Sequence, residues 1–253
     1  MNTNLKLFGL VIIVGLVHGC TSSKTDNFPM EKPYWDVKDY DNAISEIEFR
    51  TPVGEKYPTL ADPETAPIFK KLIDQKNISV VVEDDALGIR HRADFTDDMF
   101  QEYQDLANLY HAMDREDKFI YDRELVEILR FGLYLQIHYF KIGNDKIRQE
   151  SDNSEQVKDV IRRNEQVIIS NFNNYLDFVN HEKSFSEESL QSYAAGIDES
   201  FAQLIATFPN GSYNNMISKA TDMDKKAVNP GVKKAITNLI SELKTKMNAV
   251  AVN

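Results

Sequence analysis

The chain has 253 residues, of which 42% are hydrophobic, and its formal net charge at pH 7 is −11. This length fits one main domain, and the hydrophobic fraction is sufficient for a core. The acidic balance disfavours nucleic acid as a partner, because phosphates require a basic surface. Ten glycines and eight prolines are few for an all-β sandwich, which needs many turns.

The first residues have the organisation of an export signal. A weakly basic start and an almost wholly apolar run lead to Gly19 and Cys20. The apolar run is shorter than the ~20 residues that a membrane-spanning helix needs. Cys20 is the only cysteine, so it has no partner for an internal disulfide. We therefore expect residues 1–19 to be a signal peptide. The alternatives are an uncleaved anchor, or an ordinary signal cut near Gly19 that leaves a free thiol.

The segment 16–20, Leu-Val-His-Gly-Cys, resembles the lipobox of bacterial lipoproteins, although His18 is an unusual middle residue. The resemblance covers the signal alone. It implies that Cys20 is acylated and that the chain is attached to membrane lipid through it. By the enterobacterial sorting rule, Thr21 after the cysteine implies the outer membrane. The resemblance leaves open whether the protein faces the periplasm or the cell surface.

Residues 20–61 are predicted to form a lipid-anchored tether that leads into an irregular arm, ahead of a helical domain at residues 62–253. Prolines recur along the arm and interrupt helices. Its later part also contains apolar residues, which pure linkers lack, so we expect that part to dock on the domain. These residues are Tyr34, Trp35, Ile44, Ile47 and Phe49.

The first part of the domain is predicted to combine a short helix, a short strand and a loop. Asp62-Pro63-Glu64 favours a helix start, which predicts a helix from residue 62 to about residue 74. Residues 78–82 are apolar, mostly β-branched and bounded by polar residues, as is typical of a strand. Residues 84–95 are expected to form a loop.

Longer amphipathic helices follow the loop. Apolar residues at three- and four-residue steps predict helices at about 96–114, 122–142 and 154–182. Another begins after the capping residue Ser186 and stops before Pro209-Asn210-Gly211, and the last begins at Asn229-Pro230. A shorter helix is expected at 213–221. Five main helices with short connections predict an all-α, antiparallel helical bundle.

The helix predicted at 122–142 has one polar stripe on an otherwise apolar circumference. At 100° per residue, the stripe lies within about 60° of residue 127. Such a stripe is either a pocket wall or a solvated face that contains an ordinary Glu127–Arg130 ion pair. Gln136 lies opposite the stripe, and Gly132 would let a neighbouring helix approach closely. The stripe consists of Glu124, Glu127, Arg130, Tyr134, His138 and Lys141.

Arg90-His91-Arg92 is a basic cluster in an acidic chain. It is a candidate site for a carboxylate or a phosphate, or else a solvated loop that is bonded to acids such as Asp85. Aromatic residues between positions 103 and 140 fit either a ligand cleft or a core. This group comprises Tyr103, Tyr110, Phe119, Tyr121, Phe131, Tyr134, Tyr139 and Phe140.

Recognisable catalytic and metal-binding motifs are absent from the sequence. It has no Glu-x-x-His pair, no Gly-x-Ser-x-Gly elbow and no glycine-rich phosphate loop, so no metal, cofactor or catalytic residue is predicted. The sequence favours a non-enzymatic interaction protein of the cell envelope, such as an adaptor, an assembly part or an inhibitor, with a protein partner. A binder of small molecules or glycans is the alternative. The least favoured alternative is a hydrolase that uses Glu124 or Glu127 as acid or base.

Overall fold

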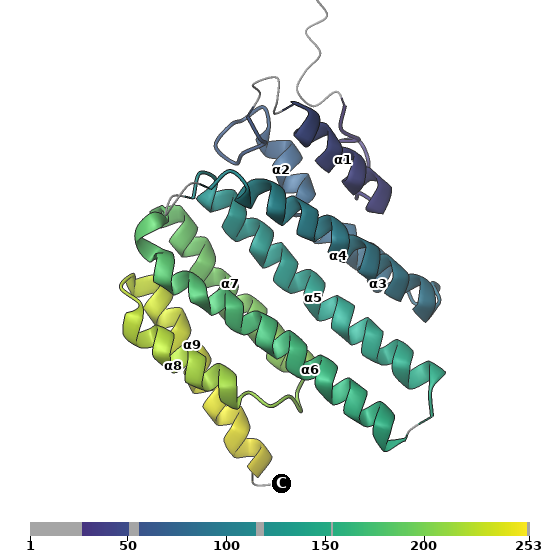
Figure 1. The fold of residues 1–253 in the computed structure, drawn as a ribbon, viewed down its shortest axis with the longest axis vertical. Helices are drawn as coiled ribbons and strands as arrows, with labels where there is room; N and C mark the ends of the chain where they lie inside the picture. The colour runs from purple at the N-terminus through teal and green to yellow at the C-terminus, as the bar shows by residue number, and fades with distance from the viewer. Residues whose placement is uncertain (1–26, 51–55, 115–118, 153, 252–253) are drawn as a thin grey trace, which may run out of the picture.

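A computed structural model describes residues 27–50, 56–114, 119–152 and 154–251, which form an all-α fold without a strand (Figure 1). The predicted signal peptide and Cys20 lie outside these residues. In the described part, no helix is both long enough and apolar enough to cross a membrane. The elements are α1 (Val37–Arg50), α2 (Ala66–Leu72), α3 (Lys76–Val82), α4 (Ile89–His111), α5 (Asp122–Glu150), α6 (Glu155–Leu176), the 3₁₀ helix η2 (Asp177–Ser184), α7 (Glu187–Thr207), α8 (Asn214–Lys226) and α9 (Pro230–Ala251).

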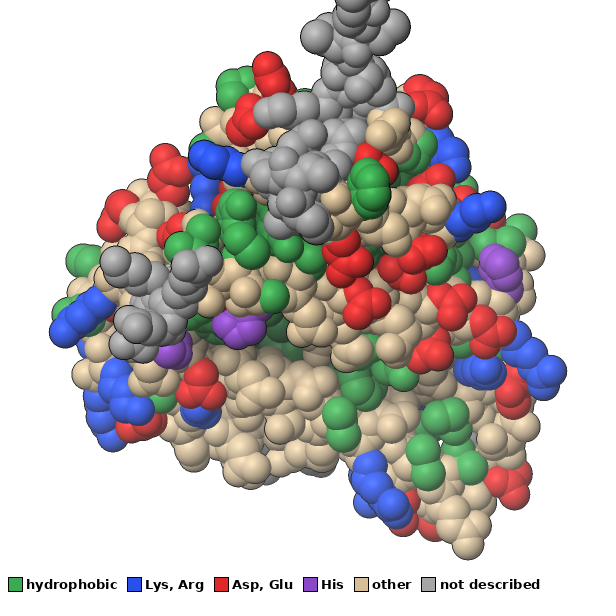
Figure 2. Space-filling model, turned by 45° about the horizontal axis from the view of Figure 1, so that its top comes forward, with side chains coloured by type: hydrophobic (Ala, Val, Ile, Leu, Met, Phe, Trp, Pro, Cys, Tyr) green, Lys and Arg blue, Asp and Glu red, His purple; other side chains and the backbone are tan. Residues whose placement is uncertain are grey.

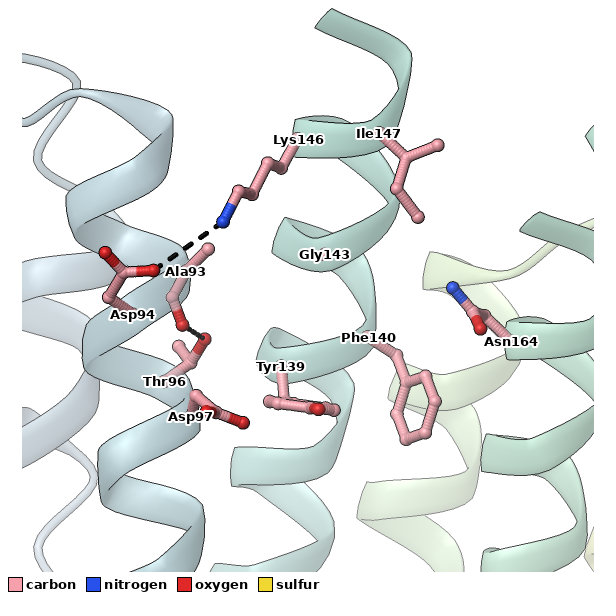
Figure 3. Close-up of a pocket in the computed structure, with 10 residues that line it drawn as sticks. All are labelled: Ala93, Asp94, Thr96, Asp97, Tyr139, Phe140, Gly143, Lys146, Ile147 and Asn164. Carbon is pink, nitrogen blue, oxygen red and sulfur yellow. Dashed lines mark hydrogen bonds and ion pairs between the residues drawn. The ribbon is translucent and has the colours of Figure 1, made fainter. Parts of the chain in front are cut away.

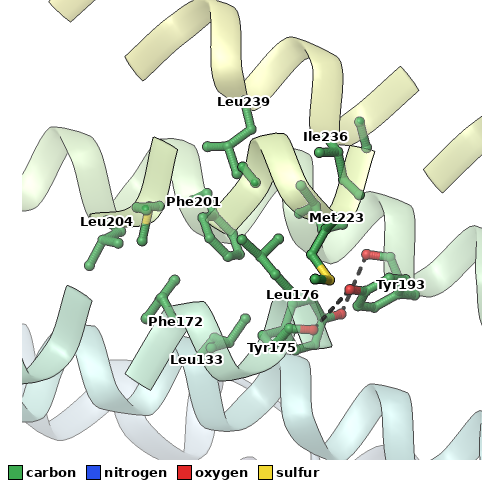
Figure 4. Packing of buried hydrophobic residues seen from close by; sticks show 14 of the residues in the cluster. Leu133, Phe172, Tyr175, Leu176, Tyr193, Phe201, Leu204, Met223, Ile236 and Leu239 are labelled. Carbon is green, nitrogen blue, oxygen red and sulfur yellow. Dashed lines mark hydrogen bonds between the residues drawn. The ribbon is translucent and has the colours of Figure 1, made fainter. Parts of the chain in front are cut away.

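Helix α5 is the central element of the fold. Leu133 and Ile137 on one part of its surface belong to a hydrophobic core with α6 to α9, part of which is shown in Figure 4. Phe131 and Leu135 belong to a second core, which α5 shares with α1 to α4. Helices α4, α5 and α6 lie side by side and alternate in direction, as predicted for an antiparallel bundle (Figure 1). The two cores leave only part of the surface of α5 uncovered.

Two predicted helix starts in the C-terminal half are confirmed. The Ser186 hydroxyl accepts the backbone N–H of Ser189 at 3.3 Å and caps α7. The Asn229 side chain accepts the backbone N–H of Gly231 at 2.9 Å and that of Val232 at 3.1 Å, where α9 begins. Helix α7 ends at Thr207, two residues before the predicted Pro-Asn-Gly stop.

The predicted strand at 78–82 is wrong, because these residues belong to helix α3. Ile78 and Val82 are both buried, and they are four residues apart, so one helical face carries both of them into the N-terminal core. A single strand without a partner would leave its backbone hydrogen bonds unmade, whereas a helix makes them internally. The β-branched composition is therefore overridden by the packing.

The prediction of an irregular arm is also wrong for residues 37–50, which form α1. Asp36 and Asp39 open this helix: Asp36 accepts the backbone N–H of Asp39 at 2.9 Å, and Asp39 accepts that of Asp36 at 3.2 Å. The expected docking is confirmed for Trp35 and Ile44, which are 0% and 6% exposed. It is wrong for Phe49, which is 73% exposed.

Several helix boundaries differ from those predicted. Helix α4 begins at Ile89, so the second half of the expected loop 84–95 is helical. Helix α5 continues through Gly143-Asn144 to Glu150. Asn144 is 1% exposed and accepts a hydrogen bond from Asn164 of α6 at 2.9 Å, so a residue beyond the predicted end of the helix links two helices. The segment after Leu176 changes to a 3₁₀ helix.

The close approach expected at Gly132 is confirmed. A methyl group at this position would lie 2.2 Å from the ring of Tyr103, which α4 presses against the backbone of α5. The Tyr103 ring is 8% exposed and packs on Gly132, so the absence of a side chain at this position lets the two helices approach closely.

Candidate functional site

The first half of the polar stripe on α5 forms an interhelical network. One guanidinium nitrogen of Arg130 lies 3.2 Å from both carboxylate oxygens of Glu127, and another lies 2.9 Å from Glu199 of α7. Ser192 of α7 also donates a hydrogen bond to Glu127. The predicted Glu127–Arg130 pair is thus present, and its bonds hold α5 to α7.

Glu124 also has a structural position. Its side chain is 5% exposed and accepts the backbone N–H of Leu60 at 2.7 Å, which fixes the segment before α2 against α5. Neither Glu124 nor Glu127 lines any of the hollows described below. The geometry therefore gives no support for a hydrolase that uses either carboxylate.

The second half of the stripe, Tyr134, His138 and Lys141, faces the end of α3. The ring centroids of Tyr134 and His138 are 4.5 Å apart, and His138 lines a hollow of about 400 Å³ between the end of α3, the start of α4 and α5. Burial, with a smaller effect of Lys141, lowers the pKa of His138 to about 4. The imidazole is therefore neutral at pH 7, and its buried Nε2 has no hydrogen-bond partner among the described residues.

The basic cluster does not form one site, because its three residues lie in the first turn of α4, where successive side chains point in different directions. Arg90 is exposed and pairs with Glu150 at the end of α5, and His91 is also exposed. The Arg92 side chain is 16% exposed and lines the same hollow as His138. The structure thus brings together one residue of the cluster and one residue of the stripe.

A second surface, which the sequence reasoning missed, lies on the opposite side of α5. Two hollows of about 410 and 230 Å³ are found between α4 and α6, with α5 as their floor. Figure 3 shows the larger one, with Asp94 and Asp97 of α4 on one side, Tyr139 and Phe140 of α5 below, and Asn164 of α6 on the other side. We call the two hollows together the α5 groove.

The floor of the α5 groove has the spacing of a coiled-coil seam. Eight residues of α5 line it, and six of them, all but Tyr139 and Lys146, recur at alternating steps of four and three. They are Leu129, Leu133, Gln136, Phe140, Gly143 and Ile147. On α6, Asn164, Asn171 and Asn174 line the groove, and Val160 and Val167 fall on the same face by helical geometry. These two valines are 41% and 47% exposed.

Aromatic rings and amides connect the two hollows. Phe100 of α4 stacks on Tyr139 of α5 with ring centroids 5.3 Å apart, and each ring lines one of the hollows. Across the floor, Asn171 donates to Gln136 at 3.0 Å. Of the predicted aromatic group, Tyr103, Tyr139 and Phe140 line the groove, whereas Tyr110 and Phe131 are core residues.

The α4 edge of the groove is acidic. Asp94 and Asp97 line the groove and are exposed, whereas Asp98 and Asp105 are exposed on the part of α4 that is turned away from it. Figure 2 shows acidic side chains gathered on the side of the molecule where α1 and α4 lie. Burial, followed by the charges of Asp41, Asp105 and Asp98, raises the pKa of nearby Glu102 to about 7. Lys146 of α5 lies 3.6 Å from Asp94 and offsets part of this charge.

Comparison with protein-family models, curated proteins and solved structures finds no match. Within the described residues, no group of three or more histidine, cysteine, aspartate or glutamate side chains could hold a metal ion. The assignment of function therefore depends on the two surfaces of α5.

Proposed function

We propose that this chain is a lipid-anchored interaction protein of the bacterial envelope, which binds an amphipathic helix of a partner protein in the α5 groove. The observation that supports this most strongly is the pattern of the groove. Of the α5 side chains with coiled-coil spacing, Leu133 and Gln136 are buried, but Leu129, Phe140 and Ile147 stay partly exposed. Helix α6 presents two exposed valines toward the same face. Helix-in-groove recognition uses apolar anchors at three- and four-residue steps of this kind.

The dimensions of the groove suit a helix. From Leu129 to Ile147 the floor extends about 27 Å at 1.5 Å per residue, which corresponds to five turns of a docked helix. Apolar anchors of the partner would pack on Leu129 and Phe140, which line the groove and are partly exposed. The amides of Gln136 and Asn171 would favour one register, since a polar residue in such a seam has to meet a polar partner.

The charge of the groove edge specifies the partner further. The acidic residues of α4 favour a helix whose corresponding side carries lysine or arginine, and the acidic surface would steer such a partner toward the groove. These contacts at the edge affect the association rate and the orientation of binding more than the affinity.

The anchor rests on the lipobox resemblance around Cys20. Two or more acyl chains hold a protein stably on a bilayer, so a protein acylated in this way would remain in the membrane fraction. The Cys20→Ser variant should appear in the soluble fraction or accumulate as an unprocessed precursor. Fractionation and mass spectrometry of the intact protein measure this, and unchanged mass with full membrane retention would refute lipidation.

Replacement of the two exposed groove valines should abolish partner binding without unfolding the protein. In the double variant Val160→Asp, Val167→Asp, two charges face the docked helix, and burial of an unpaired charge costs several kcal/mol. Val228→Asp is the matched control, because Val228 is 69% exposed and lies outside the groove. Quantitative mass spectrometry of cross-linked complexes should show a protein that the double variant loses and the control retains.

Two results would contradict the proposal. One is the recovery of the same partners with the double variant as with Val228→Asp. The other is a partner whose contact region is not an amphipathic helix. Circular dichroism of both variants establishes that the fold is intact, which separates lost binding from lost structure.

A further inference from the structure

The hollow that His138 and Arg92 line lies on the face of α5 that points away from the groove. Val82, Ile89 and Ile142 give it an apolar wall. Its volume of about 400 Å³ lies at the small end of the range for ligand pockets. We call it the His138 pocket. Its polar lining consists of Glu83, Asp85, Arg92, His138, Lys141, Asp145 and Gln149.

Two nitrogen atoms of this lining are buried without a partner among the described residues, Nε of Arg92 and Nε2 of His138. Arginine donates hydrogen bonds only, and a neutral imidazole can donate from Nε2. A buried donor that is left unsatisfied costs about 1–3 kcal/mol. Both atoms are covered by other protein atoms, so a ligand that carries a hydrogen-bond acceptor would satisfy them after a small movement of the two side chains.

One end of the Arg92 guanidinium is already fixed. Its Nη1 donates to the backbone oxygen of Val82 at 3.1 Å and to Asp85 at 3.2 Å. These bonds orient the guanidinium and leave Nε for a ligand. A carboxylate is the best acceptor for a guanidinium, because a charged hydrogen bond contributes more than a neutral one.

The exposed part of the lining is acidic. The Asp85 side chain is 98% exposed, and Glu83 is also exposed. Lys141, the other cation of the lining, is paired with Asp145 at 2.9 Å. A simple anion would meet these carboxylates as it enters, whereas a ligand with a cationic end would be attracted by them.

We infer that the His138 pocket binds a small zwitterion such as an amino acid or a short peptide. Its carboxylate accepts from Arg92 and His138 in the interior, and its ammonium group lies beside Glu83 and Asp85 at the rim. This site is independent of the α5 groove, since the two surfaces lie on opposite sides of α5. Failure of the groove proposal would leave it unaffected.

The test compares zwitterions with compounds that carry only one of the two charges. 4-Aminobutyrate and glycylglycine carry both charges, butyrate carries only the carboxylate, and butylamine carries only the ammonium group. Titration of the isotope-labelled protein at pH 7.5, followed by NMR, should show saturable shifts around α3 and α5 for at least one of the zwitterions. We expect that zwitterion to bind about 10-fold more tightly than butyrate or butylamine, which corresponds to one charged hydrogen bond.

Arg92→Gln and His138→Gln should each weaken zwitterion binding about 10-fold. Arg123→Gln is the control, because Arg123 is 40% exposed and pairs with Glu188 of α7, away from the pocket. Thermal melting shows whether each variant is folded, and either of the two pocket variants suffices if the other is not. The inference is overturned if neither zwitterion binds, if butyrate alone binds equally well, or if the folded pocket variants bind like the wild type.

Discussion

Trp35→Ala should lower the free energy of unfolding by about 3–5 kcal/mol, the range for removal of a large buried aromatic side chain. The indole is 0% exposed, stacks with Phe28 at a centroid distance of 6.3 Å and meets Tyr40 edge-on at 6.4 Å. Its Nε1 donates to the carbonyl of Pro29 at 3.0 Å. Truncation therefore leaves both a cavity and an unsatisfied acceptor.

The matched control is Phe49→Ala on α1. Phe49 is 73% exposed, so its loss should change the free energy of unfolding by no more than about 0.5 kcal/mol. Urea denaturation followed by circular dichroism measures both variants. Equal stability of the two would show that residues 27–50 do not form part of the folded core.

As the pH decreases from about 6.5 to 4, the contribution of His138 to the free energy of unfolding should fall by up to about 3 kcal/mol. Burial lowers the pKa of the folded imidazole to about 4. The unfolded chain, with an ordinary pKa near 6.5, binds a proton first, so acid favours the unfolded state. The charged and titratable neighbours in the pocket are Glu83, Asp85, Arg92, Lys141 and Asp145.

His138→Gln should remove this part of the pH dependence, because glutamine does not titrate. The titration of Glu102 changes the free energy of unfolding in the opposite direction. Its pKa is raised to about 7, so the stability that its protonated form contributes is lost as the pH rises toward 7. The informative quantity is therefore the difference between the wild type and the variant in urea titrations at pH 4, 5, 6 and 7. His91→Gln, which removes an exposed imidazole, is the control. A constant difference across this range would show that His138 does not titrate as described.

The all-α class and the principal helices could be predicted because amphipathic spacing and capping residues are local signals. Ser186 and Asn229 make the hydrogen bonds that their positions suggested. The failures have tertiary causes. The β-branched segment at 78–82 is helical because its helical face completes a core, and α5 passes through Gly143-Asn144 because Asn144 is bonded across to α6.

The candidate sites were predictable only in part. Arg92 and His138 were both candidates, but they are 46 positions apart in the sequence, and only the packing of α3, α4 and α5 brings them to one pocket. Glu127 and Arg130 of the stripe link α5 to α7, and Glu124 binds the segment before α2. The α5 groove was missed because its floor has the composition of a core face, and sequence alone does not reveal which core-like face stays uncovered. The four-and-three spacing on α5 was the available signal.

Site-specific photo-cross-linking tests the groove most directly. A photoreactive benzoylphenylalanine placed at Val167 lies on the face of α6 that borders the groove, and the same residue at Val228 lies outside the groove. In cells that express the full chain, the probe at Val167 should cross-link to a basic, amphipathic helical segment of one envelope protein, and the probe at Val228 should not. The account would be contradicted by identical cross-links from the two positions, by cross-links between copies of this chain, or by none from Val167.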